Sequence, residues 1–411
     1  MPRERGKMSR RVVITGIGAI TAYGIGKDAL CDGLLAGRAC HREIPAGFGR
    51  GYEFRSRFYV PFPDFRLADF VDTPYEHAME RTSHLAVAAT HLAREDAGRP
   101  SLETAAIILG VGIGSLRTAF QSHLAHLGAP GGGRFNRMVI PMTMPNAAAA
   151  WVSILFGSHG PAYTVNASCA SGTYAIGEAY GRIARGEADI AVTGGVECLV
   201  DPSGSIMRGF DGLGALTAAP DGWPRPFTKG RSGFLFSEGG GAVLILEERE
   251  QACWRGAPIY AEIAGFASGS EAGSILQMEE SGAAIVALLR RLVGTERPDY
   301  LNAHGTGTLN NDETEARAIR EVFGGAERQP LINATKGFLG HAIGASGAIE
   351  AAVTALAIQR GQVHGNVLDD PLDDLNLAQE ATERPIRSAV SLSFGFGGHV
   401  AGLLLRSALP D

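Results

Sequence analysis

The sequence predicts an α/β fold made of two related halves, residues 1–255 and 256–411. Apolar runs rich in β-branched residues alternate with segments of helical period, which is typical of α/β proteins. Within these runs apolar and polar residues do not alternate, so we expect strands that are buried on both faces beneath helices. Two pairs of short motifs also recur in the same order in the two parts of the chain, which indicates a duplication.

The elements of the first half follow one another with few ambiguous stretches. Its opening strand is a β-branched run closed by glycine, and its helices carry alanine and leucine on a repeating face. In chain order we expect a strand at 11–18, a helix at 28–35, an irregular segment at 40–75, a helix at 80–97, a strand at 105–112, helices from 117 and at 147–156, a strand ending near 165, a helix at 171–185, a strand at 189–195, a loop at 210–233, a strand at 240–247 and a helix at 248–255.

The second half repeats two motifs of the first. Val-Asn-Ala-Ser at 165–168 corresponds to Ile-Asn-Ala-Thr at 332–335, and small residues and a helix follow both. The Gly-rich strand at 239–246 has its counterpart at 397–405. If a pseudo-twofold axis relates the halves, the turn after residue 168 faces the loop 336–341 across the junction. Two distant stretches then build one site.

Composition argues against several classes of protein. The 411 residues carry a net charge of −6, with 45% hydrophobic and 19% charged residues, which gives no general attraction to nucleic acid or anionic membranes. No apolar segment approaches the length of a membrane span, and the basic start of the chain lacks the apolar core of a signal peptide. The five scattered cysteines form no CxxC pair, so we expect no metal site and a reducing, cytoplasmic location.

Cys169 is the candidate nucleophile. It lies between the run that ends at Val165 and the helix expected from Ser171. The free N–H groups of a first helical turn converge there, and their partial positive charge favours a thiolate. The alternative is an inert cysteine, because free cysteines are often simply small core residues.

His304 and His341 each lie in a Gly-rich loop after a predicted strand, at 302–308 and 336–344. Ligands of α/β sheets gather at that end of the strands. Each histidine alone is equally well explained as a structural residue. Together with Cys169 they fit a cysteine–histidine pair with histidine as base, or acyl transfer with neutral histidines as hydrogen-bond donors to an oxyanion. The glycines favour acyl transfer, because they let backbone N–H groups approach a carbonyl oxygen.

Several segments of the chain resemble motifs of the β-ketoacyl-acyl-carrier-protein synthases, the ketosynthase branch of the thiolase superfamily. They occur in the same order as in that family. The resemblance covers nearly the whole chain and is strongest to the elongating fatty-acid and type II polyketide ketosynthases. It implies a thiolase-like fold of two duplicated halves, layered α-β-α-β-α with mixed five-stranded sheets. The matching segments are residues 11–18, 166–172, 302–308, 336–347 and the Ser-Phe-Gly-Phe-Gly-Gly run at 393–398.

The resemblance implies a decarboxylative Claisen condensation of an acyl group on Cys169 with malonyl-acyl-carrier protein, in fatty-acid-like or type II polyketide biosynthesis. The backbone N–H groups of Cys169 and Phe396 would form an oxyanion hole, and Phe396 would gate the acyl pocket. His304 and His341 would bind the thioester carbonyl of the extender and stabilise the enolate formed on loss of CO₂.

The same resemblance implies supporting residues and partners. Lys336 and Glu315 would support the histidines, although a purely structural ion pair is the alternative, and Thr306 and Thr308 would contact pantetheine. No cofactor of the enzyme's own is expected, because acyl carrier protein brings the substrates on phosphopantetheine. We expect a homodimer, or a heterodimer with a chain-length-factor-like subunit, and neither nucleic acid nor membrane as a partner.

Two sites depart from the family pattern. His399-Val400 replaces the usual Thr-Asn, and Ser232 stands where Asp is usual, which puts one buried ion pair in doubt. These changes favour a secondary-metabolic enzyme. A biosynthetic thiolase would need a second catalytic cysteine in the last loop, where none occurs, and a chain-length-factor-like subunit would lack Cys169.

Overall fold

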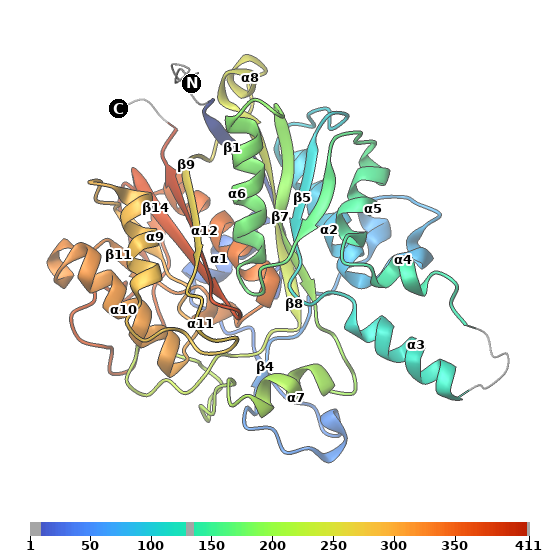
Figure 1. Cartoon of the computed structure of the whole chain (residues 1–411), viewed down its shortest axis with the longest axis horizontal. Helices are drawn as coiled ribbons and strands as arrows, with labels where there is room; N and C mark the ends of the chain where they lie inside the picture. The colour runs from blue at the N-terminus through green and yellow to red at the C-terminus, as the bar shows by residue number, and fades with distance from the viewer. Residues whose placement is uncertain (1–9, 129–134, 409–411) are drawn as a thin grey trace.

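One mixed sheet of eleven strands runs through the computed structural model, which describes residues 10–128 and 135–408 (Figure 1). The strand order is β11-β10-β14-β15-β9-β1-β8-β7-β5-β6, and β2 pairs with β1. The strands are β1 (Val12–Thr21), β2 (Gly24–Ile25), β5 (Ala106–Gly110), β6 (Ala162–Val165), β7 (Ile190–Cys198), β8 (Gly239–Glu248), β9 (Ala261–Ser270), β10 (Tyr300–Asn302), β11 (Leu331–Asn333), β14 (Ser388–Gly395) and β15 (His399–Arg406). Short strands form two separate pairs, β3 (Arg42–Glu43) with β4 (Phe58–Tyr59) and β12 (Gln362–Val363) with β13 (Thr382–Glu383).

The two halves of the sheet have the same topology. In the order β6-β5-β7-β8-β1 the first two pairings are parallel and the last two antiparallel. The order β11-β10-β14-β15-β9 repeats this pattern. Both recurring motif pairs occupy equivalent places, after β6 and β11 and along β8 and β15, so the predicted duplication is confirmed. The two sets of five strands are joined, because β1 pairs with β9 over Val12–Ile14 and 261–263.

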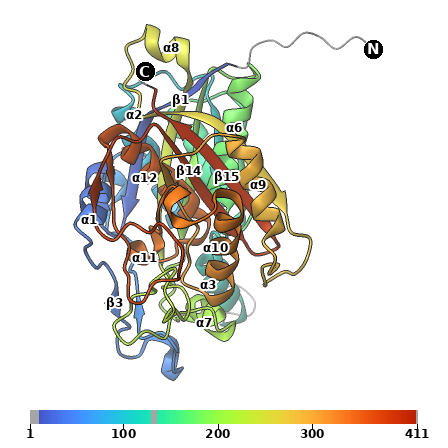
Figure 2. The ribbon, with the colours of Figure 1, turned by 90° about the vertical axis from the view of Figure 1, so that its left-hand side faces the viewer.

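Helices lie on the outer faces of the sheet and between its two halves (Figures 1 and 2). Helices α2 and α5 cover the first half, α9 and α10 cover the second, and α6 and α12 pack against each other between them. This is the predicted α-β-α-β-α layering. The helices are α1 (Lys27–Leu35), α2 (Arg81–Asp96), α3 (Leu116–Gly128), α4 (Val139–Thr143), α5 (Ala147–Phe156), α6 (Ser171–Ala184), α7 (Ser205–Gly212), α8 (Arg249–Trp254), α9 (Ala283–Val293), α10 (Leu309–Phe323), α11 (Lys336–Leu339) and α12 (Ser346–Arg360). No helix of the described residues is long and apolar enough to cross a membrane.

Small residues allow the two central helices to approach closely. All residues of α12 from Ser346 to Ile358 are buried, and most are alanine, glycine or aliphatic. A Cβ atom on Gly172 of α6 would lie 2.8 Å from the backbone nitrogen of Ala348. The crossing therefore requires glycine, and it fixes the start of α6, and with it Cys169, against the second half.

The sequence located most elements of the first half to within a few residues. Helix α5 has the predicted bounds, α2 is shorter than predicted by one residue at each end, and α6 ends one residue early. The loop predicted from residue 210 begins too early, because residues up to Gly212 belong to α7. This short helix has a buried apolar face, but its two glycines weaken the helical signal in the sequence. Helices α9 and α10 were not anticipated.

We expect Gly172→Ala to lower the free energy of unfolding by about 2 kcal/mol, because the added methyl group forces backbone apart at the crossing of α6 and α12. Urea denaturation measures the loss. The control is Gly209→Ala in α7, where a Cβ atom meets nothing within 4 Å and alanine favours the helix. Equal stability of the Gly172 variant and the wild type would contradict the packing argument.

Candidate active site

A cavity of about 310 Å³ opens between the two halves of the molecule. It is lined by six of the eight residues singled out in the sequence, namely Cys169, His304, Thr306, Thr308, His341 and Phe396. The other two, Lys336 and Glu315, are buried behind its wall. The structure thus brings together residues from four separate segments.

Cys169 occupies a constrained turn between β6 and α6. Ser168 has a φ of +54°, a left-handed conformation that costs a non-glycine residue about 1 kcal/mol. Side chains on both sides hold this turn: the Asn166 amide accepts the Ser168 N–H (3.1 Å) and donates to the Gly112 carbonyl (2.8 Å). The Ser171 hydroxyl donates to the Ser168 carbonyl (2.6 Å). The position of the thiol is therefore set by local hydrogen bonds.

The thiol of Cys169 is protonated at neutral pH. Burial raises its pKa to about 11, although the Ser168 hydroxyl, the charge of Lys336 and the N–H of Phe396 each lower it. The sequence analysis expected the start of the helix to favour a thiolate, but burial outweighs that effect. A thiol in this state must lose its proton before its sulfur can act as a nucleophile.

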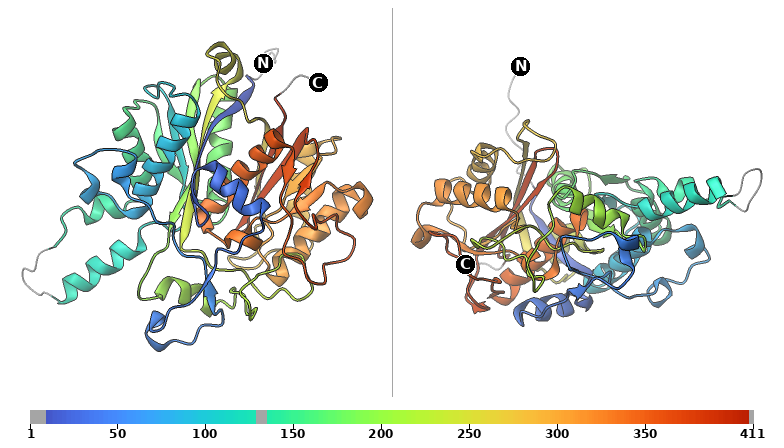
Figure 3. Two further views of the ribbon diagram at one scale, coloured as in Figure 1. Left: turned by 180° about the vertical axis from the view of Figure 1, so that it is seen from behind. Right: turned by 90° about the horizontal axis from the view of Figure 1, so that it is seen from below.

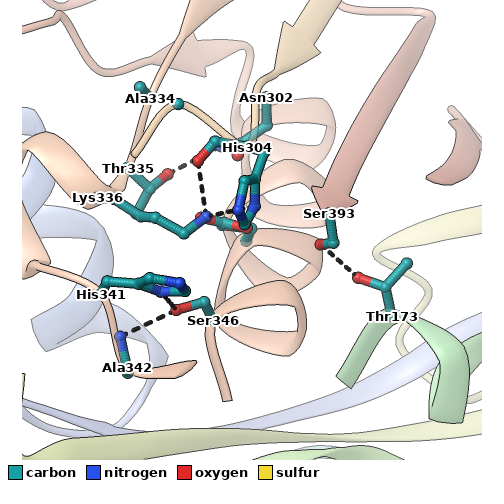
Figure 4. Close-up of polar contacts among 12 residues, drawn as sticks. Thr173, Asn302, His304, Ala334, Thr335, Lys336, His341, Ala342, Ser346 and Ser393 are labelled. Atoms are coloured by element: carbon teal, nitrogen blue, oxygen red, sulfur yellow. Dashed lines mark hydrogen bonds and ion pairs between the residues drawn. The ribbon is translucent and has the colours of Figure 1, made fainter. Parts of the chain in front are cut away.

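His304 and His341 are both neutral. Their rings lie 5.6 Å apart between centroids and are nearly perpendicular, and both side chains are buried (Figure 4). Burial disfavours imidazolium, and the charge of Lys336 adds to this effect, so both pKa values lie well below the usual range. Neutral imidazole can donate a hydrogen bond from one nitrogen and accept one at the other.

The partner of His304 identifies its protonated nitrogen. The Lys336 ammonium lies 3.1 Å from Nδ1 of His304, and because it can only donate, that Nδ1 accepts and Nε2 carries the proton. Nδ1 of His341 lies 3.0 Å from the Ser346 hydroxyl, which accepts the Ala342 N–H and can donate its proton to that nitrogen. His304 therefore presents Nε2–H as a donor, and His341 does so when the Ser346 hydroxyl donates to its Nδ1.

Lys336 is almost completely buried and has three partners (Figure 4). Besides Nδ1 of His304, its ammonium donates to the His304 carbonyl (2.7 Å) and to Glu350 Oε1 (2.5 Å). Burial raises the pKa of Glu350, and Lys336 holds it down. Sequence reasoning missed Glu350, for which the only signal is a lone carboxylate in an otherwise apolar, Ala-rich helix.

The Glu315 side chain binds the backbone of the His304 loop and forms no ion pair with Lys336. Its carboxylate accepts the N–H groups of His304 (2.8 Å) and Gly305 (2.9 Å), and burial raises its pKa to about 7. The sequence analysis gave a structural ion pair of Lys336 with Glu315 as an alternative. In the structure Lys336 forms its ion pair with Glu350 instead.

Glu197 is a second buried carboxylate that the sequence did not single out. It accepts N–H groups from Gly112, Ile113 and Gly114 of the first half and from Gly344 of the second, over 2.7–3.2 Å. It therefore ties the loop beside Cys169 to the loop that carries His341. A lone acid within the apolar strand β7 was its only signal.

The departures from the family pattern lie beside this site. Arg231, next to Ser232, is buried and lies 3.8 Å from Asp312, and its Nε has no hydrogen-bond partner in the part of the chain that the structure describes. The Ser232 hydroxyl instead accepts the Ala218 N–H (2.9 Å). The His399 ring packs edge-on against Tyr174, at 6.0 Å between centroids.

The chain resembles known proteins over most of its length. The model of the β-ketoacyl synthase N-terminal domain matches residues 9–252, and that of the C-terminal domain matches residues 260–368. The sequence is 35% identical over 413 residues to 3-oxoacyl-[acyl-carrier-protein] synthase 2 of Staphylococcus aureus (strain COL), covering 97% of this chain and 98% of that protein.

Two solved structures have similar folds. The ishigamide ketosynthase/chain length factor has a TM-score of 0.89 and 30% identity, with 98% of this chain and 100% of that chain covered. A type II PKS acyl-carrier protein in complex with its ketosynthase bound to the hexaketide has a TM-score of 0.85 and 26% identity, with 98% and 100% covered.

We expect alkylation of Cys169 by iodoacetamide to become about tenfold faster per pH unit between about pH 7 and 9, because only the scarce thiolate reacts when the pKa is near 11. Mass spectrometry of the Cys169 peptide measures the rate. In the variant Lys336→Met the rate at each pH should fall, since the lysine charge lowers the thiol pKa. A rate that reaches its plateau below pH 8 would contradict the protonated thiol.

Proposed function

The chain belongs to the β-ketoacyl synthase family, and we propose that it condenses an acyl group held on Cys169 with malonyl-acyl-carrier protein to give β-ketoacyl-carrier protein. One observation carries the proposal: a thiol and two neutral imidazoles, those of His304 and His341, line a single cavity. The family's reaction is an acyl transfer, and this cavity has the groups needed to hold the acyl chain and to stabilise an enolate.

The first step transfers the acyl group to the enzyme. The Cys169 sulfur attacks the thioester carbonyl of the acyl-carrier protein, and the backbone N–H groups of Cys169 and Phe396 stabilise the oxyanion. Glycine at 395 permits this arrangement, because a Cβ atom there would lie 3.1 Å from the Cys169 nitrogen. The carbon–sulfur bond to pantetheine then breaks, and the proton of the Cys169 thiol ends on the pantetheine thiol.

The second step forms the carbon nucleophile. The malonyl thioester oxygen accepts hydrogen bonds from Nε2–H of His304 and of His341. The bond to the carboxylate breaks, CO₂ leaves, and its electron pair forms an enolate whose oxygen both donors stabilise. The enolate carbon attacks the acyl carbonyl, the carbon–sulfur bond to Cys169 breaks, and the thiolate takes up one proton.

Lys336 acts as a positioning residue in this scheme. Its ammonium fixes Nδ1 of His304 as an acceptor, and its charge disfavours protonation of both rings. Glu350 balances that charge away from the cavity. Thr306 and Thr308, whose hydroxyl groups lie 2.9 Å apart on the cavity wall, would contact pantetheine.

The partner proposed for this enzyme is acyl carrier protein, and the enzyme uses no cofactor of its own.

A second chain of the same fold would cover an exposed apolar surface on α3–α5, because α3 projects from the body and has no buried residue (Figures 1 and 3). This surface consists of Phe120, Leu124, Leu127, Phe135, Ile140, Met144 and Ile154. The likeness to a ketosynthase/chain length factor favours a type II polyketide pathway.

The remaining assignments also belong to this proposal. Residues 1–255 and 256–411 form the two thiolase-like halves, and the cytoplasm is the proposed location, since all five cysteines are free thiols. A non-catalytic chain-length-factor role is disfavoured by the presence of Cys169 and both histidines.

We expect incubation with an acyl-carrier thioester to add one acyl mass to the wild type and none to Cys169→Ala, as read by intact-mass spectrometry. The matched control is Cys198→Ala, which removes another buried thiol and should leave acylation unchanged. If both the wild type and Cys169→Ala gain the mass, or neither does, the nucleophile is misassigned.

Replacing His304 or His341 with alanine should slow CO₂ release from malonyl-carrier protein by about two to three orders of magnitude, because one donor to the enolate is lost. Release of labelled CO₂ measures this rate. The exposed His159 provides the control variant His159→Ala, which should match the wild type. Undiminished release by either cavity variant would remove that histidine from the mechanism.

A further inference from the structure

Ser346, the first residue of α12, provides the hydrogen-bond partner of the His341 ring (Figure 4). Its hydroxyl oxygen lies 3.0 Å from Nδ1 of His341 and accepts the backbone N–H of Ala342, also over 3.0 Å. The side chain is only 4% exposed. A buried hydroxyl group therefore stands between a backbone donor and one nitrogen of the histidine ring.

The turn from His341 to Ser346 is held by contacts outside the turn itself. Ile343 has a φ of +46°, a left-handed conformation that a branched residue adopts only where the surrounding structure imposes it. The next residue, Gly344, donates its N–H to the buried carboxylate of Glu197 over 3.1 Å. The fold therefore places the hydroxyl beside the ring before any substrate binds.

The surroundings of the Ser346 hydroxyl indicate the direction of its bond to the ring. A serine hydroxyl has one proton to donate and two lone pairs that accept. If Nδ1 of His341 carried the ring proton, the oxygen would accept both from Nδ1 and from the Ala342 N–H. The hydroxyl proton would then have no acceptor among residues 10–128 and 135–408. Because an unpartnered buried donor is unfavourable, the hydroxyl is better satisfied when it donates to Nδ1.

We propose that Ser346 is a positioning residue for the decarboxylation step: its hydroxyl donates to Nδ1 of His341 and so places the ring proton on Nε2, which binds the malonyl thioester oxygen. His304 obtains the same arrangement from Lys336, whose ammonium can only donate. The two histidines thus reach one tautomer through different partners. This inference rests on the proposed function, because the oxygen bound by Nε2 belongs to the malonyl thioester.

Imidazole ¹⁵N NMR of the unliganded protein tests the direction of the bond. With the His341 signals assigned by substitution, the wild type should show a protonated Nε2 and an unprotonated Nδ1 at neutral pH. In Ser346→Ala the proton is no longer confined to Nε2, so Nδ1 should gain part of it. A proton on Nδ1 in the wild type would overturn the inference, because the hydroxyl would then donate to water in the cavity of about 10 Å³ that Ser346 lines.

The rates of the two proposed steps separate positioning from a structural role. Ser346→Ala should slow CO₂ release from malonyl-carrier protein by about threefold or more, because the ring then divides its proton between two nitrogens. Acylation of Cys169 should keep its rate, since His341 acts in the second step. Ser346→Thr retains a hydroxyl group and should restore CO₂ release.

Ser391→Ala is the matched control. Ser391 is fully buried, its hydroxyl has no partner in the part of the chain that the structure describes, and it does not line the catalytic cavity. Both of its rates should match those of the wild type.

Two kinetic results would overturn the inference: wild-type CO₂ release by Ser346→Ala, or an equal loss of both rates in that variant, which would show a structural role. If Ser346→Ala does not fold, the wild-type tautomer and the rates of Ser346→Thr still decide. A wild type that is neither acylated nor releases CO₂ would refute the proposed function, whereas the tautomer measurement would still test the bond from Ser346 to His341.

Discussion

The contact between the buried Lys336 ammonium and Nδ1 of His304 is the interaction on which the site depends. It sets the proton of His304 on Nε2, and its positive charge adds to burial in keeping both imidazoles neutral. A buried ammonium is stable only with partners, and Glu350 together with the His304 carbonyl supplies them. The neutral state of the two imidazoles therefore depends on a lysine whose ion pair lies outside the cavity.

The duplicated fold explains how distant segments reach one cavity. The Cys169 turn follows β6, and the loop of Lys336 and His341 follows β11, the equivalent strand of the other half. The two halves pack closely where α6 crosses α12. Glu197 also links a loop of each half, because its carboxylate accepts four backbone N–H groups from the two loops. Packing and hydrogen bonds thus fix the geometry before any substrate binds.

The sequence alone was sufficient to single out those site residues that stand in a recognisable local motif. Cys169, His304 and His341 stand in Gly-rich turns at strand ends, and their motifs identify them without coordinates. Glu350 and Glu197 could not be found in this way, because the partners of Glu197 lie 83 to 147 residues away and those of Glu350 depend on how α12 packs. The state of the thiol was also misjudged, since the start of a helix is a local feature whereas burial is a property of the whole fold.

The most direct test of the account is ¹⁵N NMR of the imidazole nitrogens in selectively labelled protein, with His304 and His341 assigned by substitution, between about pH 6 and 8. The account predicts two neutral rings with the proton on Nε2 and an unprotonated Nδ1, and no titration over this range. Imidazolium signals from either residue, or a proton on Nδ1 of His304, would contradict it.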